Sequence, residues 1–412
     1  MQGGEIARRP HPVVYTILNV PFGATGGFVS VALTFLATKS GLSVTQGATL
    51  IAAQMFPNVW KFFWAPIADT TLTRKRWYAI ANGVCALGML AMAILPLGVE
   101  TLSAMWGVIL LTSFAATFVG FSVEALVAHL TPPEDLGRAG GWLQAGNLGG
   151  AGIGGGIGLW LLTHAPATWQ AGIVLALLTL ACTLPLLFLP DVKAEPSNGV
   201  GDALKNVATD LWSVIRSPRG ILCAVLCFVP VGTGAASGVL TQAEVAAHWG
   251  AGASEVALVQ GILTGVIAMV GCLAGGAVCA RMKARTAYVL FGALMAATTA
   301  LMAVAPPTPS VYIGFSLFYA FVAGLSYAAF SGFVLDAIGA GNAATKYNGF
   351  ASLSNTPIWY MGLLLAWVET RSGPNQMLMA ESAMGIAGIA IFAFVVFLVR
   401  RTRSEATPAV AP

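Results

Sequence analysis

Two ionisable side chains stand inside long apolar stretches, at positions suited to proton chemistry. Lys61 lies eight residues before Asp69, and Glu124 lies eight residues before Pro132. If these segments are helical, each side chain is about 12 Å from the end of its helix, at 1.5 Å per residue. A lysine and a glutamate at one depth can pair, and the carboxylate can take up a proton when its partner is removed. A purely structural pair, or a lysine that reaches to the interface, is the alternative.

The composition shows which solvent surrounds these residues. The chain has 412 residues, of which 57% are hydrophobic and 9% are charged, whereas soluble domains carry about 25% charged residues. A membrane-spanning helix needs about 20 mostly apolar residues. We therefore predict an all-α membrane protein with twelve transmembrane helices. They lie at about 13–38, 45–66, 77–96, 101–129, 138–163, 168–190, 219–248, 255–280, 286–305, 310–338, 345–369 and 376–399.

The basic residues predict the orientation. With the N-terminus in the cytoplasm, Lys39 and Arg371 are outside and Lys61 is within a span, which leaves 17 of the 20 Lys and Arg inside. This positive-inside bias, with an even number of spans, predicts cytoplasmic termini and a multi-pass protein of the bacterial inner (plasma) membrane. The net charge of +4 fits contacts with anionic lipid headgroups and predicts no nucleic-acid partner. The six cysteines and four histidines show no metal-ligand spacing, so we expect no metal and no cofactor.

Short segments recur at a nearly constant offset. Val20-Pro21-Phe22-Gly23 returns as Val229-Pro230-Val231-Gly232, and Gly120-Phe121-Ser122 matches Gly324-Leu325-Ser326. This predicts two six-helix pseudo-repeats. We expect an N-terminal bundle at 1–190, a cytoplasmic linker at 191–218 with an amphipathic helix on the membrane surface, and a C-terminal bundle with a short tail at 219–412.

The loop after the second span resembles the signature of the major facilitator superfamily, Gly-x-x-x-Asp followed by a basic cluster. Here Ala65 stands in the glycine position, and Asp69 is followed by Arg74, Lys75 and Arg76. The resemblance implies that Asp69, Arg74 and Arg76 cap a facing helix and latch the two bundles in one state. Asp336, near the inner end of span 10, can act as a similar cap or latch. A basic turn that only anchors the loop is the alternative.

The segment Trp60-Lys61-Phe62-Phe63-Trp64-Ala65-Pro66 is similar to one in the muropeptide permease family and the related acetyl-coenzyme A transporters. Glu124 continues this likeness in span 4, and Pro132, Glu134 and Gly137 follow it. The resemblance implies an amphiphilic or anionic solute of the muropeptide type.

Paired helix breakers indicate a central site. Pro21 with Gly23 and Pro230 with Gly232 interrupt spans 1 and 7 at matching positions, which points to the binding site of a transporter. The side chains expected to contact a solute or to take part in coupling are Lys61, Glu124, Asn19, Tyr15, Gln242, Tyr327, Asn355 and Trp359. Kinks that serve packing alone are the alternative. Glu381 lies toward an outer helix end, where we expect it to be solvated.

Gly150 and Gly154 belong to a stripe of glycines at every fourth residue of span 5. Such stripes allow helices to approach closely. In the superfamily, spans 5 and 8 face each other across the two bundles, so the stripe is expected to let the bundles rock.

These features predict a secondary active transporter, a proton-coupled symporter that moves a small solute by alternating access. Its expected partners are a small-molecule substrate, protons and membrane lipids, and we expect a monomer without enzymatic activity. A non-transporting membrane assembly factor with the same fold is an alternative. A membrane-embedded transferase is less favoured, because it needs a cluster of reactive side chains beside a large loop, and the outer loops are short.

Overall fold

The computed structural model describes residues 10–42, 44–192, 200–240, 243–256, 258–259, 263–339 and 342–405. Over these residues the chain is helical and contains no strand. The helices before the linker are α1 (Val13–Gly27), α2 (Thr34–Lys39), α3 (Val44–Trp60), α4 (Ala65–Thr70), α5 (Arg74–Ile94), α6 (Leu102–Leu130), α7 (Leu136–Gly152), α8 (Gly158–His164) and α9 (Thr168–Ala181). The others are α10 (Val200–Arg216), α11 (Pro218–Phe228), α12 (Ala236–Leu240), α13 (Ala243–Ala246), α14 (Ala253–Val256), α15 (Thr264–Cys279), α16 (Ala284–Val304), α17 (Pro309–Ile338), α18 (Ala343–Ser372) and α19 (Pro374–Glu405).

Local sequence explains where several helices begin. Thr73 and Ser217 cap α5 and α11 by accepting a backbone N–H three residues on, and Thr308 does the same for α17. Pro218 and Pro309 occupy the first helical position, where a missing N–H costs nothing.

Seven described helical segments are long and apolar enough to cross a membrane, or eight if the bent pair at α10 and α11 is one span. They are Val13–Ala37, Arg74–Ile94, Leu102–Leu130, Thr168–Phe188, Ala284–Val304, Pro309–Ile338 and Pro374–Val399. The other predicted spans are interrupted or carry more polar residues: α3 and α4 are separated by a 3₁₀ turn at Lys61–Phe63, and α18 buries Lys346 and Asn348. The count of twelve spans and the internal repeat therefore stay predictions.

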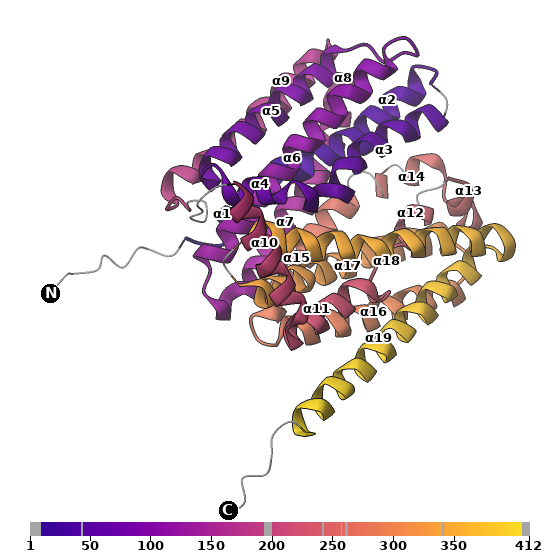
Figure 1. Ribbon diagram of the computed structural model, residues 1–412. Helices are drawn as coiled ribbons and strands as arrows, with labels where there is room; N and C mark the ends of the chain where they lie inside the picture. Colours follow the sequence, from indigo (N-terminus) through magenta and orange to yellow (C-terminus); the bar gives the residue numbers. More distant parts are fainter. Residues whose placement is uncertain are drawn as a thin grey trace, which may run out of the picture.

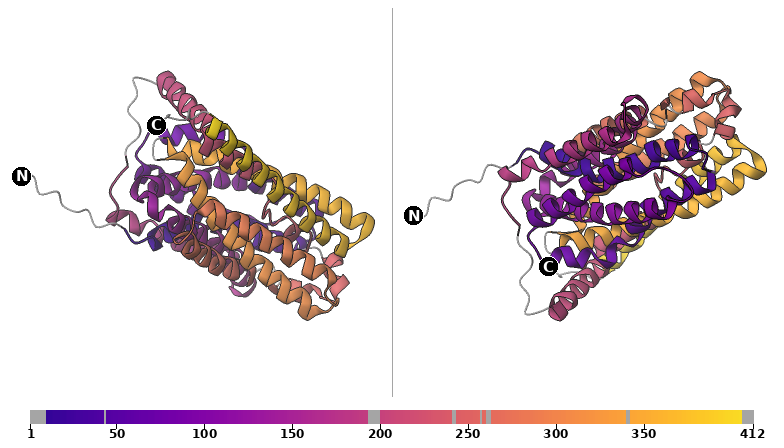
Figure 2. Two further views of the ribbon diagram at one scale, coloured as in Figure 1. Left: turned by 90° about the horizontal axis from the view of Figure 1, so that it is seen from below. Right: turned by 90° about the horizontal axis from the view of Figure 1, so that it is seen from above.

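The helices before and after α10 form two groups that meet along a central seam. In Figure 1 helices α2, α3, α5, α6, α8 and α9 occupy the upper part, α4 and α7 lie near the centre, and α15 to α19 extend from the centre to the lower and right part. Most helices run along one common direction in Figure 2. The largest part of the seam is formed by α7, which packs against α1 of its own group and against α15 and α17 of the other; α18 adds contacts with α4 and α6. Movement between the groups must therefore change the contacts of α7.

Helix α10 packs across this seam. It contacts α4, α11 and α18, and its C-terminal part makes an angle of 87° with α11. The linker helix predicted from 191–218 is thus present over Val200–Arg216, and it binds protein from both groups rather than lying apart from them.

The predicted break at Pro21 is wrong, whereas the break at Pro230 is present. Helix α1 continues through Pro21, since membrane helices tolerate proline in their interior. Helix α11 ends at Phe228, and α12 begins only at Ala236. Gly232 and Gly234 between them have positive φ values of 59° and 68°, a conformation that favours glycine.

The glycine stripe faces a different helix from the one predicted. A Cβ added at Gly150 would lie 2.5 Å from the Val20 carbonyl oxygen, and one at Gly154 would clash with the Ala24 carbonyl. Gly150 therefore packs α7 against α1, and Gly154, in the π-helical turn Ile153–Ile157 that follows α7, packs against the same helix, inside one group. The α7 contact with α15 uses other glycines, since a Cβ on Gly141 would lie 2.6 Å from the Gly276 Cα. Helical spacing shows which residues share a face, but not which neighbour that face meets.

Candidate functional site: a closed end and a central cavity

Asp69 joins the two helix groups at one end of the seam. Its Oδ2 accepts hydrogen bonds from the Thr345 backbone N–H and hydroxyl, both at 2.7 Å. Its Oδ1 accepts from the Ala344 N–H at 3.4 Å and pairs with Arg74 at 3.0 Å. Asp69 and Arg74 are fully buried. The carboxylate of α4 thus caps α18, and Arg74 balances its charge. Arg76 is exposed and takes no part in this contact.

Glu124 makes the next contact between the groups. Its Oε2 accepts a hydrogen bond of 2.6 Å from the Asn348 amide of α18. Lys61 is also buried, and its Nζ lies 5.9 Å from the centre of the Phe22 ring. The described ion pairs are Arg74–Asp69 and Lys346–Asp210, so Lys61 and Glu124 are not in direct contact. The direct partner of the Glu124 carboxylate is Asn348.

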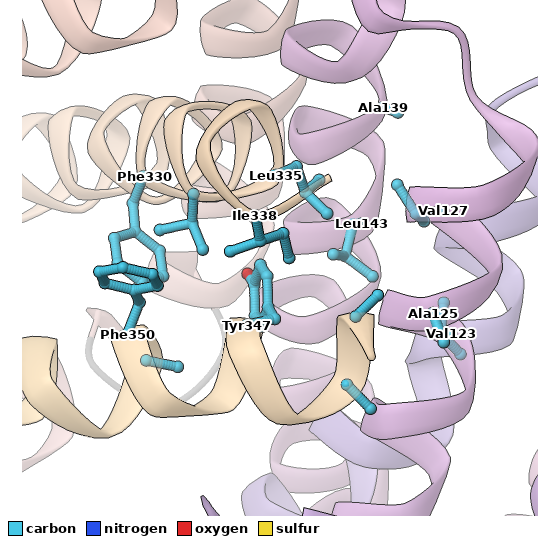
Figure 3. Packing of buried hydrophobic residues seen from close by; sticks show 14 of the residues in the cluster. Val123, Ala125, Val127, Ala139, Leu143, Phe330, Leu335, Ile338, Tyr347 and Phe350 are labelled. Carbon is cyan, nitrogen blue, oxygen red and sulfur yellow. The ribbon is translucent and has the colours of Figure 1, made fainter. Parts of the chain in front are cut away.

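A third polar contact joins α7 to α17 and α18. The Gln144 amide of α7 donates to the Ser331 hydroxyl at 2.7 Å and to the Tyr347 hydroxyl at 3.3 Å. Around it, buried apolar side chains of α6 and α7, such as Val127 and Leu143, form one cluster with Ile338 of α17 and Tyr347 of α18. Figure 3 shows these side chains meeting between the helices. Polar bonds and apolar packing together close this end of the seam.

Helix α10 adds an ion pair to the same end. Asp210 lies 3.1 Å from Lys346 and accepts a hydrogen bond of 3.1 Å from Asn342. Lys346 is buried, whereas the Asp210 side chain is one third exposed. The linker therefore holds the N-terminus of α18, the same segment that Asp69 caps.

A cavity of about 390 Å³ lies farther along the seam. Leu148 and Ala151 of α7 form one wall, and the residues after the break in span 7 form another. The lining side chains that carry a hydroxyl are Thr233, Ser237, Thr264, Ser316, Tyr319 and Tyr327. None of the lining residues is charged.

The structure brings only some of the predicted contact residues to this cavity. Tyr327 lines it, whereas Asn19 donates to the Leu143 carbonyl and the Tyr15 hydroxyl accepts from Thr131, which are packing contacts of α1. Asn355 lies outside its lining, as does Trp359, whose side chain is 68% exposed. Gln242 lies outside the described residues.

Asp336 is exposed at the rim of a second, larger cavity of about 780 Å³. Four basic residues, Arg219, Arg281, Lys283 and Arg285, line the same space. Asp336 does not bind a facing helix in the way that Asp69 does. In the described parts of the chain, no three His, Cys, Asp or Glu side chains gather as a metal site would require.

The expectation that Glu381 is solvated is wrong. Its side chain is 4% exposed, and its Oε1 accepts hydrogen bonds from the Tyr319 hydroxyl at 2.7 Å and the Ala236 N–H at 3.3 Å. The break in span 7 places Ala236 beside α19, which depth along the sequence does not reveal. Sequence reasoning also missed Asn348, Gln144 and Ser331, although isolated polar residues in apolar helices are a usable signal.

Comparison with known proteins identifies the family. A family model described as the Major Facilitator Superfamily matches residues 16–359. The chain belongs to the major facilitator superfamily. Members of this superfamily are transporters, and the chain is accordingly a multi-pass membrane protein of the transporter class.

Individual relatives agree with this assignment. The anhydromuropeptide permease of Escherichia coli K12 is 23% identical over 400 residues, which cover 93% of this chain and 79% of the permease. The structure of the human organic anion transporter MFSD10 superposes with a TM-score of 0.69 at 16% identity, covering 94% of this chain and 99% of that one. The proton:xylose symporter XylE gives a TM-score of 0.63 at 12% identity, over 93% and 96% of the two chains. These two structures establish the shared fold.

Proposed function

We propose that this superfamily member is a proton-coupled secondary transporter that works by alternating access, in a bacterial inner membrane with its termini in the cytoplasm. One observation carries the proposal: the two helix groups are bonded together at one end of their seam and leave a cavity beyond it. Along α7, Gln144 binds the other group and Leu148 lines the cavity. This is a separation of one helical turn, or about 6 Å. Such a cavity is closed from the end that contains Asp69.

The cavity lining supports an amphiphilic solute. Hydroxyl groups of Tyr319, Tyr327 and Ser316 stand beside the apolar side chains of Leu148 and Ile358. Hydroxyls bind sugar-like groups by hydrogen bonds, and apolar walls accept the less polar face of the same molecule. Together with the similarity to the anhydromuropeptide permease, this favours a muropeptide-like solute over a simple ion.

In the proposed cycle, the bonds of Asp69 and Glu124 to α18 break when the closed end opens. Arg74 stays with Asp69 and keeps its charge balanced. Glu124 loses Asn348, and Lys61 is the nearby charge that can then approach it. Proton uptake or release by Glu124 would couple this step to the proton gradient.

Uptake into proteoliposomes tests the proposal. Purified protein should accumulate labelled anhydromuropeptide when an inward proton gradient is imposed, and a protonophore should abolish the accumulation. Glu124→Gln should lower gradient-driven accumulation, whereas Glu100→Gln, at an exposed loop acid, should behave like the wild type. If no muropeptide, sugar or organic anion is taken up in either orientation of the protein, the transporter proposal fails and a role in membrane assembly gains support.

A further inference from the structure

Glu381 is a buried carboxylate that the closed end of the seam does not use. It belongs to α19, and one of its oxygens is held by Tyr319 of α17 and by Ala236 at the start of α12. The other oxygen, Oε2, is buried without a hydrogen-bond partner among the described residues. A buried carboxylate oxygen without a protein partner requires an explanation, such as a bound water or a functional role.

No described cation balances this carboxylate. Helix α19 packs against α11, α12, α16 and α18, and α12 contains no titratable residue. Arg219 of α11 and Arg285 of α16 line the other cavity, while on α18 Lys346 pairs with Asp210 and Arg371 lies over the Trp367 ring. Glu369 is the acid in the last turn of α18. Tyr319 is therefore the titratable group in contact with Glu381, and an ionised carboxylate here would be buried without a counter-charge.

Glu381 is linked to both the cavity and the broken span. Tyr319 lines the cavity and donates to Glu381, so a proton from cavity water can reach the carboxyl group through one hydroxyl. The other bonded group, Ala236, follows Thr233 and Gly234, which also line the cavity. A change in the charge of Glu381 therefore alters the hydrogen bond to Ala236, at the break between α11 and α12.

We propose that Glu381 is a proton-binding site of the transport cycle, reached from the cavity through Tyr319, and that its protonation is coupled to movement of α12. The proposal rests on the proposed transport function. The Tyr319 hydroxyl passes its own proton to Oε1, to which it is hydrogen-bonded, and takes a proton from water in the cavity; the proton later leaves Glu381 for water on the opposite side once the cavity opens there. Glu381 is neutral while it is sealed between α17 and α12, and it is ionised when α12 has moved and water reaches it.

Two measurements separate this proposal from the transport function itself. Infrared difference spectroscopy on the purified protein needs no substrate: alkaline titration should remove a protonated-carboxyl C=O band that Glu381→Gln lacks and that Glu124→Gln and Glu100→Gln retain. In proteoliposomes, Glu381→Gln should keep substrate exchange at the wild-type rate but lose at least tenfold in gradient-driven accumulation. Tyr319→Phe keeps the carboxyl group and should slow the band's response to a pH jump.

A band that is absent from the wild type, or that Glu381→Gln retains, overturns the proposal whether or not any solute is transported. Wild-type accumulation by Glu381→Gln overturns it as well, as does accumulation that follows a sodium gradient instead of pH. Failure of the wild type to transport any solute, with the band present and lost in Glu381→Gln, would instead refute the transport proposal and leave the proton site in place.

Discussion

Asp69 Oδ2 lies 2.7 Å from both the backbone nitrogen and the hydroxyl oxygen of Thr345, which is 276 residues away in the chain. The first N–H groups of a helix lack partners within that helix, so a carboxylate placed there binds them and also meets the positive end of the helix dipole. Here the cap is supplied by a helix of the other group. Opening this end of the seam must therefore expose the start of α18.

Removing this cap should shift the protein toward a state that is open at the Asp69 end. Hydrogen bonds to a charged group contribute about 1.5 to 3 kcal/mol each, and Asp69 accepts three from α18, so Asp69→Ala should change the ratio of closed to open molecules by at least about 10-fold. Spin labels can be placed at the exposed residues Arg76 and Arg281, one in each group. Double electron–electron resonance should then report a longer mean distance between the labels in Asp69→Ala than in the wild type.

The control for this shift is Glu134→Ala, which removes an exposed acid near the same end without touching α18. It should keep the wild-type distance distribution. An unchanged distribution in Asp69→Ala would mean that the remaining contacts at this end, the bonds of Glu124, Gln144 and Asp210 and the apolar packing around Tyr347, are enough to hold it closed.

The Lys346–Asp210 pair should respond asymmetrically to substitution. Asp210→Ala leaves the buried Lys346 ammonium without its partner, whereas Lys346→Met leaves only a carboxylate that is one third exposed. A buried charge that loses its partner costs more than an exposed one, and partial screening by solvent brings the expected cost for Asp210→Ala to about 1 to 3 kcal/mol. Thermal unfolding in detergent should therefore rank wild type, Lys346→Met and Asp210→Ala in order of falling stability. The reverse order would show that the linker contributes little to burial of Lys346.

The sequence was sufficient for the family, for the helical class and for Asp69, because each depends on residue type and local spacing. It was not sufficient for the partners of Glu124. Depth along two helices places Lys61 and Glu124 at one level, but rotation about each helix axis decides which side chains meet. Asn348, from a helix 224 residues away, occupies that position.

Glu381 and the glycine stripe show the same limit. From its position in the sequence, Glu381 is predicted to lie at an outer helix end. It is buried because the break after α11 places the start of α12 beside it. The sequence predicts that Gly150 and Gly154 face span 8, whereas in the structure they pack against α1. Which face of a helix meets which neighbour is a property of the whole bundle.

Because Gly154 packs against α1 inside one group, a larger side chain there should affect stability rather than movement between the groups. Gly154→Ala would push the π-helical turn Ile153–Ile157, which follows α7, away from the Ala24 carbonyl of α1, so it should lower thermal stability, with an expected overpacking cost of about 1 to 3 kcal/mol. The matched control is Gly83→Ala in α5, where an added Cβ meets no atom within 4 Å. That change should be neutral or stabilising by up to about 1 kcal/mol, because alanine favours helix more than glycine. Equal destabilisation of both variants would contradict the α1 contact.

Substitutions of Asn348 and Glu124 should show whether their hydrogen bond serves stability alone or whether Glu124 also couples transport to protons. Asn348→Leu leaves the buried carboxylate without its 2.6 Å donor, and an unsatisfied buried charged group costs more than about 1 to 3 kcal/mol. Replacing both partners by leucine together with Lys61→Met removes that penalty without leaving the buried Lys61 unbalanced, so this triple variant should unfold at a higher temperature than Asn348→Leu alone. If Glu124 couples transport to protons, the triple variant should still fail to accumulate substrate against a gradient. Recovery of both stability and accumulation would show that Glu124 has a structural role, and the coupling proton would then have to be bound elsewhere.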